Sequence, residues 1–174
     1  KLKIDDRLPT GLLDTFCKRF EILGPSFYTD AACASTYGAI DHASTLLKNK
    51  ELDTVIAGGL ECNLDLSSYV LFSKLGVLAP NVCKPFDPSS KGITIGEGAV
   101  TFVLKRLKDA LENGDTIHAV IENVDGSSDG SSASLVEPTI EGQLDVYEKV
   151  HKTAPRVSYI EAHATGTSVG DKTE

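Results

Sequence analysis

The sequence lacks the features that mark exported, membrane-spanning or nucleic-acid-binding proteins. Its first residues contain no continuous apolar core, so they predict no secretory signal. No segment approaches the ~20 apolar residues that are needed to span a bilayer. Acidic residues outnumber basic ones, with 25 Asp and Glu against 17 Lys and Arg, which gives a net charge of −8. This charge disfavours nucleic acid and anionic membranes as partners.

A local basic patch could still dock an acidic carrier protein. The candidate residues for such a patch are Lys18, Arg19, Lys105, Arg106 and Lys108. The alternative is that these side chains are ordinary solvated surface.

Cysteine and histidine are few, and their spacing excludes the common metal and redox motifs. The 4 cysteines form no CxxC pair, so without an export signal we expect them to be reduced, in a cytoplasmic protein. We expect Cys62 and Cys83 to be structural. The 4 histidines show no metal-ligand spacing, so we expect no metal. Gly92, Gly96 and Gly98 fit neither nucleotide-binding spacing, which favours turns and close backbone packing.

One cysteine lies where a short strand is predicted to meet a helix. Residues 30–35 (DAACAS) place Cys33 between a strand at 26–29 and a helix at 34–48. A thiol at a helix N-terminus is favoured as thiolate by the unpaired N–H groups. Alanine on both sides keeps bulk away from the sulfur. The pattern indicates a nucleophile elbow, although a small buried structural cysteine is the alternative.

A histidine follows the predicted strand at 157–160. Residues 161–167 (EAHATGT) place His163 in a loop of small and hydroxyl residues, where an imidazole at a strand's end can point into a cleft.

The rest of the sequence alternates between segments with the apolar spacing of helices and segments with the residue pattern of strands. Helices are predicted at 12–19, 67–75, 107–113 and 139–153 in addition to 34–48. Strands are predicted at 54–57 and 117–124, and paired strands at 93–104, in addition to those already named. The strand at 26–29, the helix at 34–48 and the strand at 54–57 form a predicted βαβ crossover, which favours a parallel α/β sheet.

Together the motifs resemble the condensing enzymes, specifically the β-ketoacyl synthases. The resemblance is carried by residues 23–26, 30–35, 57–59, 74–78, 85–87, 96–99 and 161–167. Residues 30–35 and 169–174 are most similar to ketosynthase domains of polyketide and polyunsaturated fatty acid synthases. The resemblance implies a thiolase-like layered α-β-α-β-α fold, incomplete at both ends. Residues 1–114 would be part of the N-terminal half with the elbow, and 115–174 the start of the C-terminal half.

The resemblance also implies a decarboxylative Claisen condensation. Cys33 would accept an acyl group from a carrier-protein or coenzyme A thioester, and His163 would help decarboxylate a malonyl thioester. Thr165, Thr167 and Phe86 match substrate-binding positions, with local turn capping as the alternative for the threonines. Glu174 matches the buried polar network near the active site. No separate cofactor is implied, since the substrate is carried on the phosphopantetheine of an acyl carrier protein.

The sequence departs from the family pattern in two respects. Ala164 stands where the family usually has glycine, and a positive φ there would strain alanine by roughly 1 kcal/mol. The family's second histidine, preceded by lysine, and its late glycine-rich loop have no counterpart, so we expect this chain alone not to turn over. The full-length domain would be a homodimer. The alternative functions are a catalytically silent partner of the chain-length-factor type and a thiolase-like enzyme that acts on coenzyme A thioesters.

Overall fold

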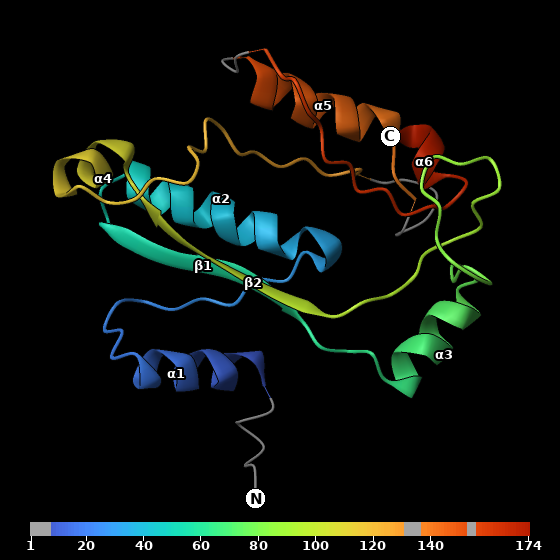
Figure 1. The fold of residues 1–174 in the computed structure, drawn as a ribbon, viewed down its shortest axis with the longest axis horizontal. Helices are drawn as coiled ribbons and strands as arrows, with labels where there is room; N and C mark the ends of the chain where they lie inside the picture. The colour runs from blue at the N-terminus through green and yellow to red at the C-terminus, as the bar shows by residue number, and fades with distance from the viewer. Residues whose placement is uncertain (1–7, 131–136, 153–155) are drawn as a thin grey trace, which may run out of the picture. The chain divides into compact units, whose positions relative to one another are not determined.

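The computed structural model describes residues 8–130, 137–152 and 156–174. The chain divides into two compact units. Figure 1 shows its helices and strands with their labels. The first unit comprises Lys1–Gly59 and Phe102–Lys105, and the second comprises Leu60–Thr101 and Arg106–Glu174.

The first unit contains two long helices and most of one strand. Helix α1 (Pro9–Arg19) is followed by the 3₁₀ turn η2 (Ala32–Ala34), helix α2 (Ser35–Lys48) and strand β1 (Thr54–Glu61). Strand β1 pairs with β2 (Gly98–Lys105) in a two-stranded sheet. Helix α1 begins at a proline, whose missing N–H falls where a helix leaves its N–H groups unpaired.

The core of the first unit is small and lies where α2 meets β1. Ala43 and Leu47 are one helical turn apart on α2 and are 2% and 5% exposed, and Ala57 of β1 is 7% exposed. Nearby, the ring of Phe27 meets the ring of His42 edge-on, with 4.8 Å between centroids. Two of these three residues are alanines, so this core buries little apolar area.

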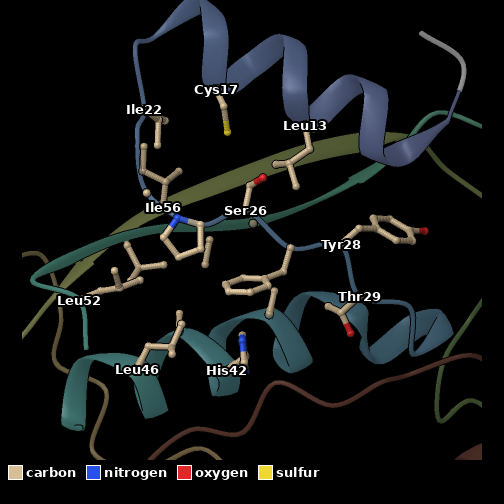
Figure 2. A pocket seen from close by; sticks show the side chains of 18 of the residues that line it. Leu13, Cys17, Ile22, Ser26, Tyr28, Thr29, His42, Leu46, Leu52 and Ile56 are labelled. Carbon is tan, nitrogen blue, oxygen red and sulfur yellow. The ribbon is translucent and has the colours of Figure 1, made fainter. Parts of the chain in front are cut away.

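An apolar cavity of about 840 Å³ lies within the first unit. Figure 2 shows it between α1, the irregular segment 22–29, α2 and β1, with Leu13, Ile22, His42 and Ile56 among the side chains around it. None of the predicted site residues lines this cavity.

The second unit, in its described residues, is built mainly from helices joined by irregular segments. These helices are α3 (Leu66–Lys74), α4 (Leu107–Asn113), α5 (Ile140–His151) and α6 (Gly170–Thr173). Asp65 caps α3 by accepting the N–H of Ser68, and Thr139 caps α5 by accepting the N–H of Gly142. Gly114 ends α4 in the left-handed conformation, φ 70°, as its C-cap position favours.

The five predicted helices are all confirmed, with shifts at their ends. Thr139 is the cap of α5 rather than its first residue, and α5 ends at His151. The predicted residue 153 lies outside the described residues. Within the described parts of the chain, no helix combines the length and apolar character that crossing a membrane requires.

Three of the predicted strands are wrong. Residues 26–29, 117–124 and 157–160 are irregular, and the predicted strand pair at 93–104 is one strand that starts at Gly98. The predicted βαβ crossover therefore has only its second strand. A strand needs neighbours for its N–H and C=O groups, and the sheet of the described residues contains only β1 and β2.

The segment 123–130 is fastened to α5 by side chains. Asn123 donates to the carbonyl of Val150 at 3.3 Å, and Ser127 donates to Asp145 at 2.7 Å. Asp129 accepts both the backbone N–H and the hydroxyl of Thr139, at 3.0 and 2.7 Å. The Thr139 hydroxyl and then its N–H lower the pKa of Asp129 from the usual 3.8.

Acidification should therefore loosen this segment. Because the folded-state pKa of Asp129 is depressed, its stabilisation is complete above the unfolded-state value of 3.8 and is lost as pH falls through the lower folded value. Asp129→Asn, which cannot titrate, should flatten the decline of the urea midpoint that wild type shows between about pH 5 and pH 2.

Asp41→Asn, at an exposed position of α2, is the matched control, since no hydrogen bond or ion pair of Asp41 occurs within the described residues. It should leave the pH profile as in wild type. A wild-type profile for Asp129→Asn would contradict the assignment.

Candidate active site

Cys33 lies in the turn that leads into α2. It is the middle residue of η2 and is exposed. Like Cys17, Cys62 and Cys83, it forms no disulfide bond. Helix α2 begins two residues later at Ser35, so the thiol lies next to the positive end of a 14-residue helix.

The turn before Cys33 is strained and is held by two side chains. Ala32 has a φ of 50°, which is unusual for a residue with a Cβ. Asp30 accepts the N–H of Ala32 at 2.9 Å, which closes an Asx turn. Ser35 accepts the N–H of Ala31 at 2.9 Å and donates its hydroxyl to the carbonyl of Ala32 at 2.7 Å. The predicted elbow is therefore a sharp, cross-braced turn.

One backbone donor beside the thiol is free. The N–H groups of Ala31, Ala32 and Ala34 all have acceptors. The N–H of Cys33 has no partner among the residues that the structure describes. An unpaired donor that is adjacent to a nucleophile can stabilise an oxyanion that forms on the attacked carbonyl.

His163 lies in the second unit, on a turn that a carboxylate holds. Glu174 accepts the backbone N–H groups of His163 and Ala164, the second at 2.9 Å. Ala164 has a φ of 52°, the conformation for which the family's glycine is suited. The side chain of His163 is exposed, and its imidazole has no hydrogen-bond partner in the described part of the chain.

Asp171 of α6 joins this turn to the loop that contains Phe86. One of its oxygens accepts the N–H of Gly166 at 2.9 Å, and the other accepts the N–H of Phe86 at 2.7 Å. Phe86 also has a positive φ, 63°. Ala164 and Phe86, the two strained residues of this region, thus each donate to a carboxylate at the end of the chain.

Gly166 is buried against the loop 83–92. Its carbonyl accepts the N–H of Gly92 at 2.9 Å and the hydroxyl of Ser90 at 2.8 Å. A Cβ on Gly166 would lie 2.5 Å from the sulfur of Cys83, so this position excludes larger residues. The Cys83 sulfur is 3.4 Å from the carbonyl of Thr165, consistent with a structural cysteine.

The predicted role of the glycines at 92, 96 and 98 holds only in part. A Cβ on Gly92 would lie 2.2 Å from the carbonyl oxygen of Val77, which is close backbone packing. Gly96 and Gly98 have nothing within 4 Å, so close packing does not explain them.

The two threonines of the turn are bonded to each other. Their hydroxyl oxygens are 3.0 Å apart, and that of Thr167 also accepts the N–H of Gly170 at 3.1 Å. Turn capping, the local alternative, is therefore a real function of Thr167. Two hydroxyls carry two hydrogens and only one lies between them, so one remains for an acceptor on a ligand.

The structure brings most of the predicted site residues together in one unit. Phe86, His163, Thr165, Thr167 and Glu174 are linked through Asp171 and the turn 163–167, all within the second unit. Cys33 belongs to the first unit.

The proposed basic patch is largely neutralised. Lys18 pairs with Asp14 at 2.5 Å, Arg106 with Asp109 at 2.5 Å and Lys108 with Glu112 at 3.7 Å. Each pair lies within one helix or at its start, as solvated surface charges usually do.

Four residues that hold the site had no role in the sequence analysis. They are Asp30, Ser35, Ser90 and Asp171. The role of Asp30 could have been predicted from local sequence, because an Asp side chain commonly accepts the backbone N–H two residues later in an Asx turn. Ser90 and Asp171 act on residues 76 and 85 positions away, so no local pattern indicates them.

Comparison with known proteins identifies the family. The profile for "Beta-ketoacyl synthase, N-terminal domain" matches residues 17–110, and that for "Beta-ketoacyl synthase, C-terminal domain" matches 118–174. The chain belongs to the β-ketoacyl synthase family.

Curated relatives of this β-ketoacyl synthase chain include large synthases. It is 40% identical over 159 residues to 6-methylsalicylic acid synthase of Penicillium terrestre, covering 88% of the chain and 9% of that protein. It is 38% identical over 161 residues to a polyunsaturated fatty acid synthase polypeptide of Thraustochytrium, covering 89% of the chain and 6% of that protein. The chain therefore spans less than a tenth of either relative.

A solved ketosynthase confirms the fold. The chain matches the ketosynthase from module 6 of the bacillaene synthase of Bacillus subtilis 168 with a TM-score of 0.89 and 32% identity. The match covers 98% of this chain and 32% of that one. The predicted thiolase-like α/β fold is thus confirmed, as a part of that fold.

The strain at Ala164 gives a direct test of this geometry. Ala164→Gly should raise the free energy of unfolding by about 1 kcal/mol, because glycine adopts a positive φ without a Cβ clash. Urea unfolding followed by circular dichroism measures the change.

Ala162→Gly, two residues earlier and not at positive φ, is the matched control and should destabilise the chain. Equal destabilisation by both substitutions would show that Ala164 is not held in the left-handed conformation.

Proposed function

We propose that this chain carries the acyl-accepting cysteine and the decarboxylating histidine of a ketosynthase. The reaction is a decarboxylative Claisen condensation between an acyl group on Cys33 and a malonyl thioester, giving a β-ketoacyl thioester. Family membership supports the reaction class. The observation that carries the proposal is the free N–H of Cys33 in a braced turn at the start of α2.

Cys33 has the features of an acyl acceptor. Its thiolate attacks the carbonyl carbon of the incoming thioester, and the carbonyl π electrons move to oxygen. The free Cys33 N–H can then donate to this oxyanion. When the tetrahedral species collapses, the C–S bond to the donor breaks, and the departing thiolate takes up a proton. The attacking sulfur lies beside the positive end of helix α2.

His163 is suited to the decarboxylation step. Its main chain is held by Glu174 while its imidazole is exposed. A neutral imidazole can donate to the thioester carbonyl of a malonyl group as carbon dioxide leaves and negative charge develops on that oxygen. The resulting enolate carbon attacks the acyl carbon on Cys33, and the Cys33 thiolate is released.

The adjacent turn can hold a pantetheine arm. The Thr165–Thr167 pair has one hydroxyl hydrogen to donate, which suits an amide carbonyl of that arm. Phe86, which Asp171 ties to the same turn, is 53% exposed and offers apolar surface. We therefore propose an acyl carrier protein, with its phosphopantetheine thioester, as the substrate-bearing partner.

Two alternatives differ from this proposal in specific residues. A silent partner of the chain-length-factor type would lack the nucleophile, whereas this chain has Cys33 in a braced elbow. A thiolase-like enzyme shares the fold, whereas the sequence EAHATGT and the two profile matches are those of ketosynthases. The relatives serve different products, so the proposal concerns the condensation and not a pathway.

Acyl transfer to Cys33 is the step to test first. The chain is treated briefly with a limiting acyl-pantetheine thioester, and labelled sites are located by mass spectrometry in native and urea-unfolded samples. In the native sample Cys33 should be labelled at least about tenfold more than Cys62, which is also exposed. In urea the two should be equal.

Cys62→Ala should leave the labelling of Cys33 unchanged. Equal labelling of Cys33 and Cys62 in the native chain would contradict the proposed nucleophile.

A further inference from the structure

The side chain of Ser35 closes a ring around the residues that precede the nucleophile. Its oxygen accepts the N–H of Ala31 at 2.9 Å and donates to the carbonyl of Ala32 at 2.7 Å. We propose that Ser35 is a positioning residue that aims the backbone N–H of Cys33 at the oxyanion of the acyl-transfer step. This inference rests on the proposed function.

Ser35 acts on the Cys33 N–H through the planarity of one peptide group. The carbonyl of Ala32 and the N–H of Cys33 belong to the same peptide unit, in which they point in opposite directions. A hydrogen bond that holds the carbonyl oxygen therefore also fixes the direction of the N–H. Ser35 supplies this bond from its hydroxyl, and its own backbone N–H donates to the same oxygen.

The conformation of the turn makes such a restraint necessary. Ala32 has a φ of 50°, a region that alanine occupies only when its surroundings hold it there. Asp30 holds the N–H of Ala32 on one side of this residue, and Ser35 holds its carbonyl on the other. With the hydroxyl gone, the Ala32 carbonyl keeps only the bond from the Ser35 N–H, and the Ala31 N–H loses its acceptor. The peptide unit before Cys33 is then held less tightly, and its N–H can tilt away from the oxyanion.

Two reagents separate this role from general support of the fold. Acyl transfer from a thioester forms an oxyanion, so its rate depends on the direction of the Cys33 N–H. Alkylation by iodoacetamide displaces iodide at a saturated carbon and forms no oxyanion. Its rate reports only how accessible the Cys33 sulfur is and how much of it is thiolate.

The experiment compares Ser35→Ala with wild type in both reactions, over a series of pH values. Acylation of Cys33 by an acyl-pantetheine thioester should fall by about tenfold, because one oxyanion donor is misdirected. The pH profile of iodoacetamide alkylation at Cys33 should stay within about twofold of wild type.

Two further variants control the result. Ser35→Thr retains the hydroxyl and should retain the acylation rate within about twofold. Ser44→Ala makes the same substitution elsewhere on α2, at a side chain that has no hydrogen bond within the described residues, and should change neither rate.

The outcomes distinguish this inference from the proposed function. A wild-type acylation rate in Ser35→Ala, or a parallel loss of acylation and alkylation, overturns the positioning role while the nucleophile stands. If wild-type protein acylates Cys33 no faster than Cys62, the proposed function and this inference both fail. Selective loss of acylation, restored in Ser35→Thr, supports the inference.

Discussion

Hydrogen bonds from backbone N–H groups to side-chain oxygens are the interaction on which the candidate site depends. In the first unit, Asp30 and Ser35 hold the turn before Cys33. In the second, Asp171 and Glu174 hold the turn of His163. The bonds to the carboxylates of Asp30, Asp171 and Glu174 are charge-assisted and are about twice as strong as neutral ones. They act on residues with positive φ, and the strain of such residues persists only where neighbouring groups restrain it.

Burial contributes little to this restraint. The largest buried apolar side chain among the described residues is Leu47, and the other three in the core are alanines at 43, 57 and 110. Many larger apolar side chains are exposed, including Leu66 and Leu71 on α3. Because apolar area removed from water is the main favourable term in folding, the chain by itself has only a small reserve of stability. The site geometry therefore relies on local hydrogen bonds more than on a close-packed core.

Features that depend on residues close together in the sequence were predicted, whereas features that depend on residues far apart were not. Helices such as α2 and α4 were predicted well, because the apolar spacing of α2 and the C-cap glycine of α4 act within a few positions. The segments 26–29, 117–124 and 157–160 have strand-like composition yet are irregular, because a strand forms only where another strand pairs with it. The motif residues were found from their pattern, whereas Ser90 and Asp171 have a visible role only once distant loops meet.

The sequence by itself determined the family and the helices, and it predicted Cys33 as nucleophile and His163 as the decarboxylating histidine, because these depend on residue type and local spacing. It also indicated the strain at Ala164, since alanine stands where a left-handed residue is favoured. Only the tertiary structure decided which groups hold those residues in place. It showed that Asp171 links Phe86 to Gly166 and that Ser35 leaves the Cys33 N–H as the unpaired donor of its turn. Such hydrogen bonds depend on distances and directions between atoms, which residue order does not specify.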